Sequence, residues 1–246
     1  MATRWCSVVV DAADPRALGS WWRDALDWQI VHEADDEVEV APPGIVGDEG
    51  VPTLEFVAVA DPKRGKNRVH LDLASQTFDD HAAIVDRLLA SGATPVDVGQ
   101  GPDETWIVLA DPEGNEFCVL HPRDEYLDGG SLAAIVMDVD DPPALADFWA
   151  AATGRSAVRH DDGDVTFRHP DGRLPDLYLL CTGDLRTGKN RVHLDVAPGV
   201  DDDREAEVAR LVALGAAPVD VGQGPDVSWV VLADPDGNAF CVLSPR

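Results

Sequence analysis

The segment GATPVDVGQGPDETWIVLADPEGNEFCVLHPR at Gly92–Arg123 returns with few changes as GAAPVDVGQGPDVSWVVLADPDGNAFCVLSPR at Gly215–Arg246. Upstream, GKNRVHLDL at Gly65–Leu73 recurs as GKNRVHLDV at Gly188–Val196, with the same shift of 123 positions. Because 246 residues are twice this shift, the chain is two copies of one unit. We therefore predict two domains, residues 1–123 and 124–246, with a linker at about 124–130.

The overall charge excludes two classes of partner. A net charge of −27 leaves no basic stripe to neutralise phosphates, so we expect no nucleic-acid binding and no attraction to an anionic membrane. No apolar run is long enough for a signal peptide or a membrane span, which favours a cytoplasmic protein. The four cysteines fit neither a disulfide framework nor a CxxC zinc site.

Each half alternates strands and helices in the order β-α-β-β-β, twice. The first helix is expected to begin at Asp14-Pro15, a capping residue followed by proline, and apolar residues then recur at helical spacing. A second helix is expected from about Asp79 to Ala90, with Gly92 at its C-terminal cap. The second half repeats this plan, with a helix after Asp141-Pro142 and another near 203–214.

These features resemble the vicinal oxygen chelate superfamily. The sequence motifs are most similar to its glyoxalase-like domains, of the glyoxalase, bleomycin-resistance and dioxygenase type. The resemblance rests on the paired modules, the Asp-Pro helix start, the VHLD strand, the Gly-Ala after the second helix and the final D-P-[ED]-G-N hairpin. It implies an α+β fold of two tandem domains, each built from two βαβββ modules that form a cupped mixed sheet with helices outside. It does not choose an activity, because the superfamily includes lyases, isomerases, extradiol dioxygenases and metal-free antibiotic-binding proteins.

The resemblance also implies where metal ligands would lie. Metal-dependent members commonly place two histidines and two carboxylates inside the cup. There are four such positions in each half of this chain. Written with the residue of the first half before its counterpart in the second, they are Ser7 and Ala134, Glu55 and Tyr178, His70 and His193, and Cys118 and Cys241. Neither half keeps the full set, and Glu55 with His70 is the most complete metal site that we can predict.

Each candidate residue also has a structural interpretation. His70 shares one strand face with Arg68 and Asp72, so it either contacts a ligand or metal or lies beside an Arg68–Asp72 ion pair. Cys118 is either a small buried apolar residue or a nucleophile that His70 activates. Glu55 is either a general base or ligand, or a partner for Arg68. The repeat adds Arg191, His193, Asp195 and Cys241 to the residues expected in the cavity.

Two further motifs concern the shape of a pocket. Trp106 and Trp229 are equivalent in the repeat and either wall a pocket for a flat apolar ligand or belong to the core. The helical tryptophans Trp21, Trp22 and Trp149 are expected in the core. The GQGPD loops are interpreted as turns, because they precede a strand and lack the helix start that cradles phosphate.

From these observations we expect a protein that binds a small organic molecule in a cupped cavity, as in sequestration of a toxic metabolite or antibiotic. No cofactor is expected. The alternative is a lyase, isomerase or dioxygenase that uses a divalent metal at Glu55 and His70, with Cys118 as a third catalytic residue. The sequence leaves open whether modules pair within a half, or across halves so that Glu55 meets His193 and Cys241. It also leaves open whether the chain is a monomeric pseudo-dimer or forms a homodimer.

Overall fold

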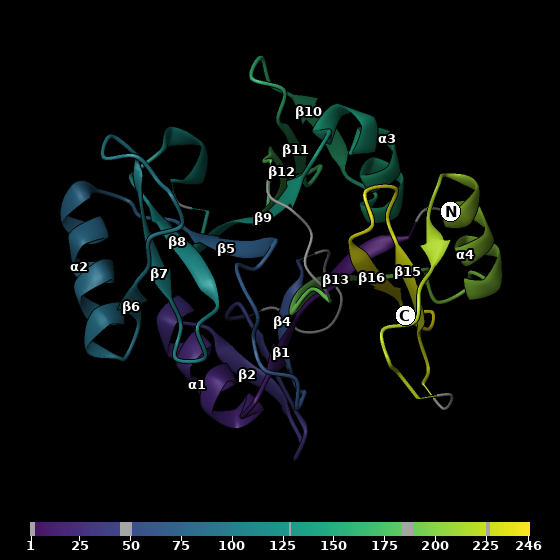
Figure 1. Cartoon of the computed structure of the whole chain (residues 1–246), viewed down its shortest axis with the longest axis horizontal. Coiled ribbons are helices and arrows are strands. Elements are labelled where there is room, and N and C mark those ends of the chain that lie inside the picture. The colour runs from purple at the N-terminus through teal and green to yellow at the C-terminus, as the bar shows by residue number, and fades with distance from the viewer. Residues whose placement is uncertain (1–2, 45–50, 128, 184–188, 225–226) are drawn as a thin grey trace.

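The computed structural model describes residues 3–44, 51–127, 129–183, 189–224 and 227–246. Its elements follow one another as four β-α-β-β-β modules, two in each half of the chain (Figure 1). The first half comprises β1 (Arg4–Ala12), α1 (Pro15–Leu26), β2 (Gln29–Glu33), β3 (Glu37–Ala41), β4 (Thr53–Ala58), β5 (Val69–Leu73), α2 (Phe78–Ala90), β6 (Thr94–Pro95), β7 (Trp106–Ala110) and β8 (Glu116–Leu120).

The second half repeats this order after a short 3-10 helix, η1 (Asp124–Tyr126). It comprises β9 (Leu132–Val139), α3 (Pro142–Thr153), β10 (Ser156–Arg159), β11 (Val165–Arg168), β12 (Asp176–Cys181), β13 (Val192–Ala197), α4 (Arg204–Ala213), β14 (Ala217–Pro218), β15 (Val230–Ala233) and β16 (Ala239–Val242). Part of the expected linker, residue 128, lies outside the described residues, as do the last two residues of the second GQGPD loop.

The helix boundaries follow from their capping residues. The Asp14 side chain accepts a hydrogen bond from the Ala17 amide at 3.0 Å, and Pro15 is the first helical residue of α1. Asp141 caps α3 in the same way. Helix α2 ends at Ala90 with Ser91 as its C-terminal cap, and Gly92 follows with a φ of +107°, a conformation that favours glycine. The helix starts are therefore those that the Asp-Pro motifs predict.

The strands form two eight-stranded mixed sheets, and each sheet combines one module from each half of the chain. Sheet A has the order β14-β15-β16-β13-β1-β4-β3-β2, so the first module joins the fourth. Sheet B has the order β10-β11-β12-β9-β5-β8-β7-β6, so the second module joins the third. Among the pairings that the sequence left open, the structure shows pairing across the two halves.

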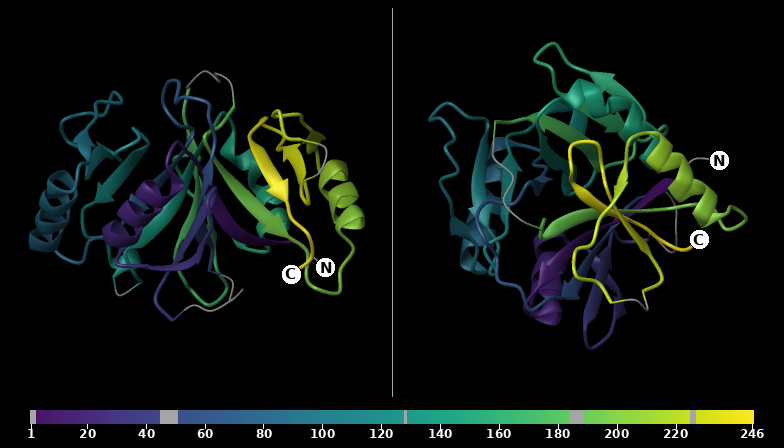
Figure 2. Two further views of the ribbon diagram at one scale, coloured as in Figure 1. Left: turned by 90° about the horizontal axis from the view of Figure 1, so that it is seen from below. Right: turned by 45° about the vertical axis from the view of Figure 1, so that its right-hand side comes forward.

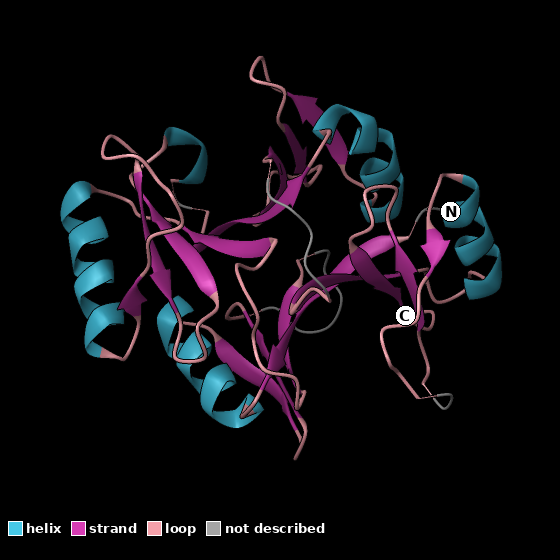
Figure 3. Cartoon of the chain, viewed as in Figure 1, coloured by secondary structure: helices cyan, strands magenta, loops and turns pink. Residues whose placement is uncertain are grey.

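The four helices lie on the outside of the sheets (Figures 2 and 3). Trp22 on α1 lies among the core residues and contacts Phe117 of sheet B, with ring centroids 5.2 Å apart. Trp149 on α3 contacts Phe240 of sheet A in the same way, at 5.5 Å. These two helices therefore pack against both sheets and join them through one continuous apolar core. None of the described helices has the length and apolarity of a membrane span.

Candidate functional site

A cavity lies on each sheet, and we call these two cavities cup A and cup B. Cup A has a volume of about 770 Å³ and lies on the face of sheet A that presents Glu55, His193 and Cys241. Cup B has a volume of about 450 Å³ and lies on the corresponding face of sheet B, with His70 and Cys118. Both volumes fall within the usual range for pockets that bind small molecules.

Strand register places the polar side chains of cup A in rows. Val9 of β1 pairs with His193 on one side and with Glu55 on the other. Glu55 in turn pairs with Glu39 of β3. Because directly paired residues point to the same face, His193, Glu55 and Glu39 share one row across the cup.

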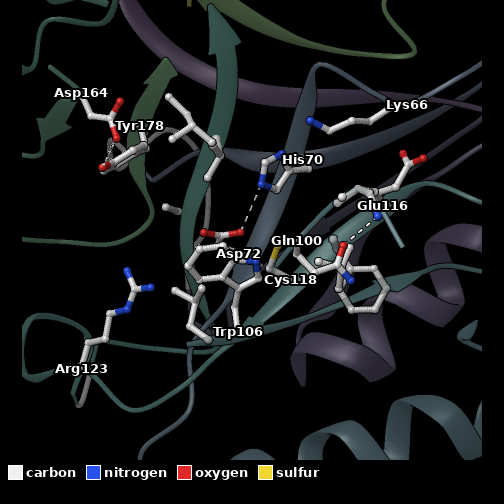
Figure 4. A pocket seen from close by; sticks show the side chains of 18 of the residues that line it. Lys66, His70, Asp72, Gln100, Trp106, Glu116, Cys118, Arg123, Asp164 and Tyr178 are labelled. Carbon is white, nitrogen blue, oxygen red and sulfur yellow. Dashed lines mark hydrogen bonds and ion pairs between the residues drawn. The ribbon is translucent and has the colours of Figure 1, made fainter. Parts of the chain in front are cut away.

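The same row in cup B has different chemistry. Val136 of β9 pairs with His70 and with Tyr178, and Tyr178 pairs with Thr166. The tyrosine and threonine therefore occupy the places of the two glutamates in cup A. Figure 4 shows His70, Asp72 and Cys118 in the middle of cup B, with Tyr178 and Asp164 to one side and Lys66 and Glu116 to the other.

Both cups also contain the same cluster of one histidine, one aspartate and one cysteine. In cup B, His70 Nε2 lies 3.5 Å from Asp72 Oδ1, and Asp72 pairs with Cys118 across neighbouring strands. In cup A, the corresponding distance is 3.4 Å, between His193 Nε2 and Asp195 Oδ1. The donor atoms of each cluster all lie within 4.8 Å of one another. We call the two clusters triad B and triad A.

Burial determines the protonation of both triads. It lowers the pKa of His70, and it lowers that of His193 to about 4, so both imidazoles are neutral at pH 7. Burial and the neighbouring aspartate raise the pKa of each cysteine thiol far above its ordinary value. Each thiol therefore stays protonated and donates a hydrogen bond to the aspartate, whose own pKa burial raises. This protonation does not favour a thiolate nucleophile.

The triads nevertheless fit a divalent metal of the kind that the superfamily implies. An imidazole nitrogen, a carboxylate oxygen and a sulfur suit a borderline ion such as Zn²⁺ better than a hard ion such as Mg²⁺. The histidine-to-aspartate distances of 3.5 and 3.4 Å are close to the separation of about 3.3 Å between two nitrogen or oxygen ligands of tetrahedral zinc. A metal bound there would be held by three protein ligands, which leaves a position for a substrate oxygen.

Glu55 and His70, which were expected in one metal site, lie in different sheets and line different cups. This is a correction, and its cause is the pairing of modules across the two halves. Glu55 lines cup A together with triad A instead. Burial, and then repulsion from Glu39, raise the pKa of Glu55 to about 7, so its carboxyl group can exchange a proton near neutral pH.

Tyr178 occupies the position in cup B that Glu55 occupies in cup A. Its hydroxyl donates a hydrogen bond to Asp164 Oδ2 at 2.8 Å, and the other oxygen of Asp164 accepts the Cys181 amide at 2.9 Å. The ring stacks on His160 with centroids 5.9 Å apart. Tyr178 is therefore held in place and presents part of an aromatic face to the cavity.

The two arginines that were expected in the cups, Arg68 and Arg191, do not line either of them. Arg191 reaches over the end of sheet A and donates to the Asp11 carbonyl at 2.6 Å and to Glu113 of sheet B at 2.9 Å. Arg68 reaches in the same way to Asp236 of sheet A, at 3.1 Å. Strand alternation predicts the face correctly near the backbone, but a long side chain can leave that face, and these two join the sheets. The expected ion pairs of Arg68 with Asp72 or Glu55 are absent from the described residues.

The two tryptophans that are equivalent in the repeat line the cups, and those on helices pack in or against the core. Trp106 lines cup B and Trp229 lines cup A. Trp22 and Trp149 are buried in the core, while Trp21 is half-buried against it.

Several residues of cup B were missed in the sequence. Tyr126, placed in the expected linker, is buried and lines the cavity near Arg123. Lys66 lies at the margin and binds Asp138 at 2.7 Å, as Lys189 binds Asp11 at 2.8 Å in cup A. Both lysines belong to the repeated motif GKNRV, and this repetition could have indicated them as residues of the cups.

The described residues of the GQGPD loops lie outside helices and strands, and both loops border a cavity. Gly99 and Gln100 line cup B, and Gly222 and Gln223 line cup A. The Gln100 side chain accepts the Val98 amide and donates to the Val96 carbonyl, which fixes the loop. The repeated glutamine therefore has a structural role at each cup.

Comparison with solved structures identifies the same architecture elsewhere. Glyoxalase I from Zea mays is 14% identical and superimposes with a TM-score of 0.68, over 99% of this chain and 92% of that one. A putative dioxygenase from Bacillus subtilis subsp. subtilis str. 168 is 13% identical, with a TM-score of 0.65 over 100% of this chain and 86% of that one. At these identities the likeness concerns the fold alone. No curated protein sequence matches the chain.

The model of one protein family matches most of the chain. This is the glyoxalase-like domain, which matches residues 7–120 and again residues 134–243. The chain therefore belongs to the glyoxalase-like domain family, within the vicinal oxygen chelate superfamily, as a tandem of two such domains.

Proposed function

We propose that this protein binds a small, flat organic molecule in cup B. The observation that carries the proposal is a cavity of about 450 Å³ whose wall is mostly apolar and in which the Tyr178 hydroxyl and the Cys118 thiol are each bonded to an aspartate. Tyr178 bonds to Asp164, and the Cys118 thiol bonds to Asp72. Groups that satisfy one another in this way favour binding over bond-making, because no free nucleophile faces the cavity.

The shape and chemistry of cup B indicate the class of ligand. Trp106 and Tyr178 contribute aromatic surface, and Val108, Val136 and Leu180 contribute aliphatic surface. Planar aromatic molecules bury well against such walls. Sequestration of a toxic metabolite or antibiotic of this kind is the most concrete form of the proposal.

Isothermal titration with neutral polycyclic aromatics such as flavones tests the proposal. We expect at least one to bind, and Trp106→Ala to weaken its binding at least tenfold. Ile107→Ala is the matched control, because Ile107 is the neighbour of Trp106 on β7, is 37% exposed and does not line the cup. A full panel without any binding, or equal effects of the two substitutions, would contradict the proposal.

The triads favour a second candidate, a divalent-metal-dependent lyase, isomerase or dioxygenase acting in cup A. His193, Asp195 and Cys241 would hold the ion, which when bound would polarise a substrate oxygen. Glu55 faces the same cavity and has a pKa of about 7, which suits a general base.

Elemental analysis of the purified protein separates the two candidates. Under the second, metal is stoichiometric and is lost from cup A in His193→Ala, while Glu55→Gln retains the metal and loses activity. Metal-free protein that cannot be loaded with Zn²⁺, Mn²⁺ or Fe²⁺ would exclude the second candidate.

A further inference from the structure

Cup A and cup B differ most in their carboxylates. Glu55 and Glu39 of cup A occupy the strand positions that Tyr178 and Thr166 hold in sheet B. A third glutamate, Glu37, lies on β3 two residues before Glu39 and lines the same cavity. Thus one wall of cup A, formed by β3 and β4, carries three glutamates, which we call the acidic wall.

The acidic wall has no cation of its own among the described residues. No ion pair joins a lysine or arginine to Glu37, Glu39 or Glu55 in the described part of the chain. Thr53 donates a hydrogen bond to Glu39 at 2.7 Å, which orients that carboxylate without neutralising it.

The other cations of cup A do not neutralise this wall. Lys189 lies at the margin and is committed to Asp11 at 2.8 Å. Arg246, at the end of the chain, lines the cavity and lowers the pKa of Glu55 only as the last of several contributions.

A buried, unpartnered oxygen adds an independent observation. Asp195 is 5% exposed and lines cup A, and its Oδ1 accepts no hydrogen bond from the described residues. His193 Nε2 lies 3.4 Å from this oxygen, and no hydrogen bond joins the two atoms. An acceptor left without a donor in a buried site is costly, so a donor from a ligand would be stabilised there.

Cup A also has apolar and aromatic surface. Val9, Val57, Val231 and Leu243 line it, and Trp229 lies at its margin with 38% exposure. An inorganic ion would not fill a cavity of about 770 Å³. A molecule with an apolar body would, and the face of Trp229 can attract a positive charge.

We propose that cup A binds an organic cation, in which a protonated amine or guanidinium lies against Glu55, Glu39 and Glu37 and an apolar body lies against Trp229. The proposal rests on the proposed function only in that both treat the cups as sites for small organic molecules. It deepens that function by assigning different ligands to the two cups: neutral and flat in cup B, cationic in cup A.

Matched pairs of probes test the charge requirement directly. Dansylcadaverine carries a primary amine, and its N-acetyl derivative has nearly the same shape without the charge. In fluorescence titrations at pH 8, we expect the amine to bind at least tenfold more tightly than the acetamide. Glu55→Gln should reduce this ratio to less than threefold, and the double variant Glu55→Gln with Glu39→Gln should abolish it.

The control removes one negative charge elsewhere. Asp86→Asn lies on the exposed side of α2, outside both cups, and should leave the ratio unchanged. A reduction in Asp86→Asn equal to that in Glu55→Gln would mean that the overall charge of −27, and not the acidic wall, attracts the amine. Thermal unfolding of each variant shows whether it is folded.

The outcomes distinguish the two proposals. Equal binding of amine and acetamide to the native protein overturns the cation proposal, even while flavones bind cup B. A tenfold preference for the amine without flavone binding supports the cation proposal and contradicts the assignment of cup B. If neither amines nor flavones bind, both are wrong.

Discussion

Cup A and cup B are alike in one row of side chains and different in the next. The triads have the same residues, nearly the same histidine-to-aspartate distances and the same protonation. The neighbouring row changes from His193, Glu55 and Glu39 to His70, Tyr178 and Thr166. The same scaffold is therefore present twice, and substitutions on two strands change the charge of the cavity.

Removal of the tryptophans that join the two sheets should have the largest effect and should be equal in both halves. Trp22 donates to Asp111 at 3.1 Å, and Trp149 donates to Asp234 at 3.0 Å, both in the core. Trp22→Ala and Trp149→Ala should each lower the free energy of unfolding by about 3–5 kcal/mol, measured by urea denaturation. A difference of more than about 2 kcal/mol between them would show that the two halves are not packed equivalently.

The second prediction concerns the pH dependence of stability, which Glu55 of cup A should affect and Tyr178 of cup B should not. Burial raises the folded-state pKa of Glu55 from 4.5 to about 7, so the folded state retains a proton that the unfolded state releases. Stability is therefore unaffected by this group below pH 4.5, falls as the pH rises to 7, and stays reduced above it. Glu55→Gln should stabilise the protein by about 3 kcal/mol at pH 8 and by almost nothing at pH 4.5.

Tyr178→Phe is the comparison for that experiment. It removes the hydroxyl that bonds to Asp164 and should destabilise by about 1–2 kcal/mol. Because burial raises the pKa of the tyrosine hydroxyl further above its ordinary value, this loss should be the same at pH 5 and pH 8. Urea denaturation at both pH values checks the pair, and a stabilisation by Glu55→Gln that is independent of pH would contradict the account of Glu55.

The smallest effect should come from the cysteines of the triads. Cys118→Ala and Cys241→Ala each remove a buried sulfur and its bond to an aspartate, and should cost about 1 kcal/mol in the absence of metal. The two values should agree, because the two triads have the same residues and each thiol bonds to the aspartate of its own triad. Measurement in a chelator and again with Zn²⁺ sharpens the comparison, since metal binding to a triad would increase the cost of losing its cysteine.

Much of the fold could be predicted because it depends on local chemistry that appears in both copies. The Asp-Pro starts of α1 and α3 are helix caps, and the alternation in VHLD places Val69 and Leu71 in the core and His70 and Asp72 in the cup. Arg68 and Tyr126 were misplaced for different reasons. The reach of a long side chain is not contained in strand alternation, and a residue in an expected linker carries no pattern that indicates burial.

The sequence by itself determined that there are two units, that the histidine and aspartate of each VHLD strand share one face, and that Glu55 and Tyr178 are a point where the copies diverge. Only the tertiary structure decided which modules share a sheet. The edges of β1, β5, β9 and β13 offer similar backbone hydrogen bonds, and nothing local distinguishes one partner from another. Packing of α1 and α3 against both sheets, together with the contacts of Arg68 and Arg191 between the sheets, accompanies pairing across the halves. That pairing places Glu55 with His193, Asp195 and Cys241, and so determines the chemistry of cup A.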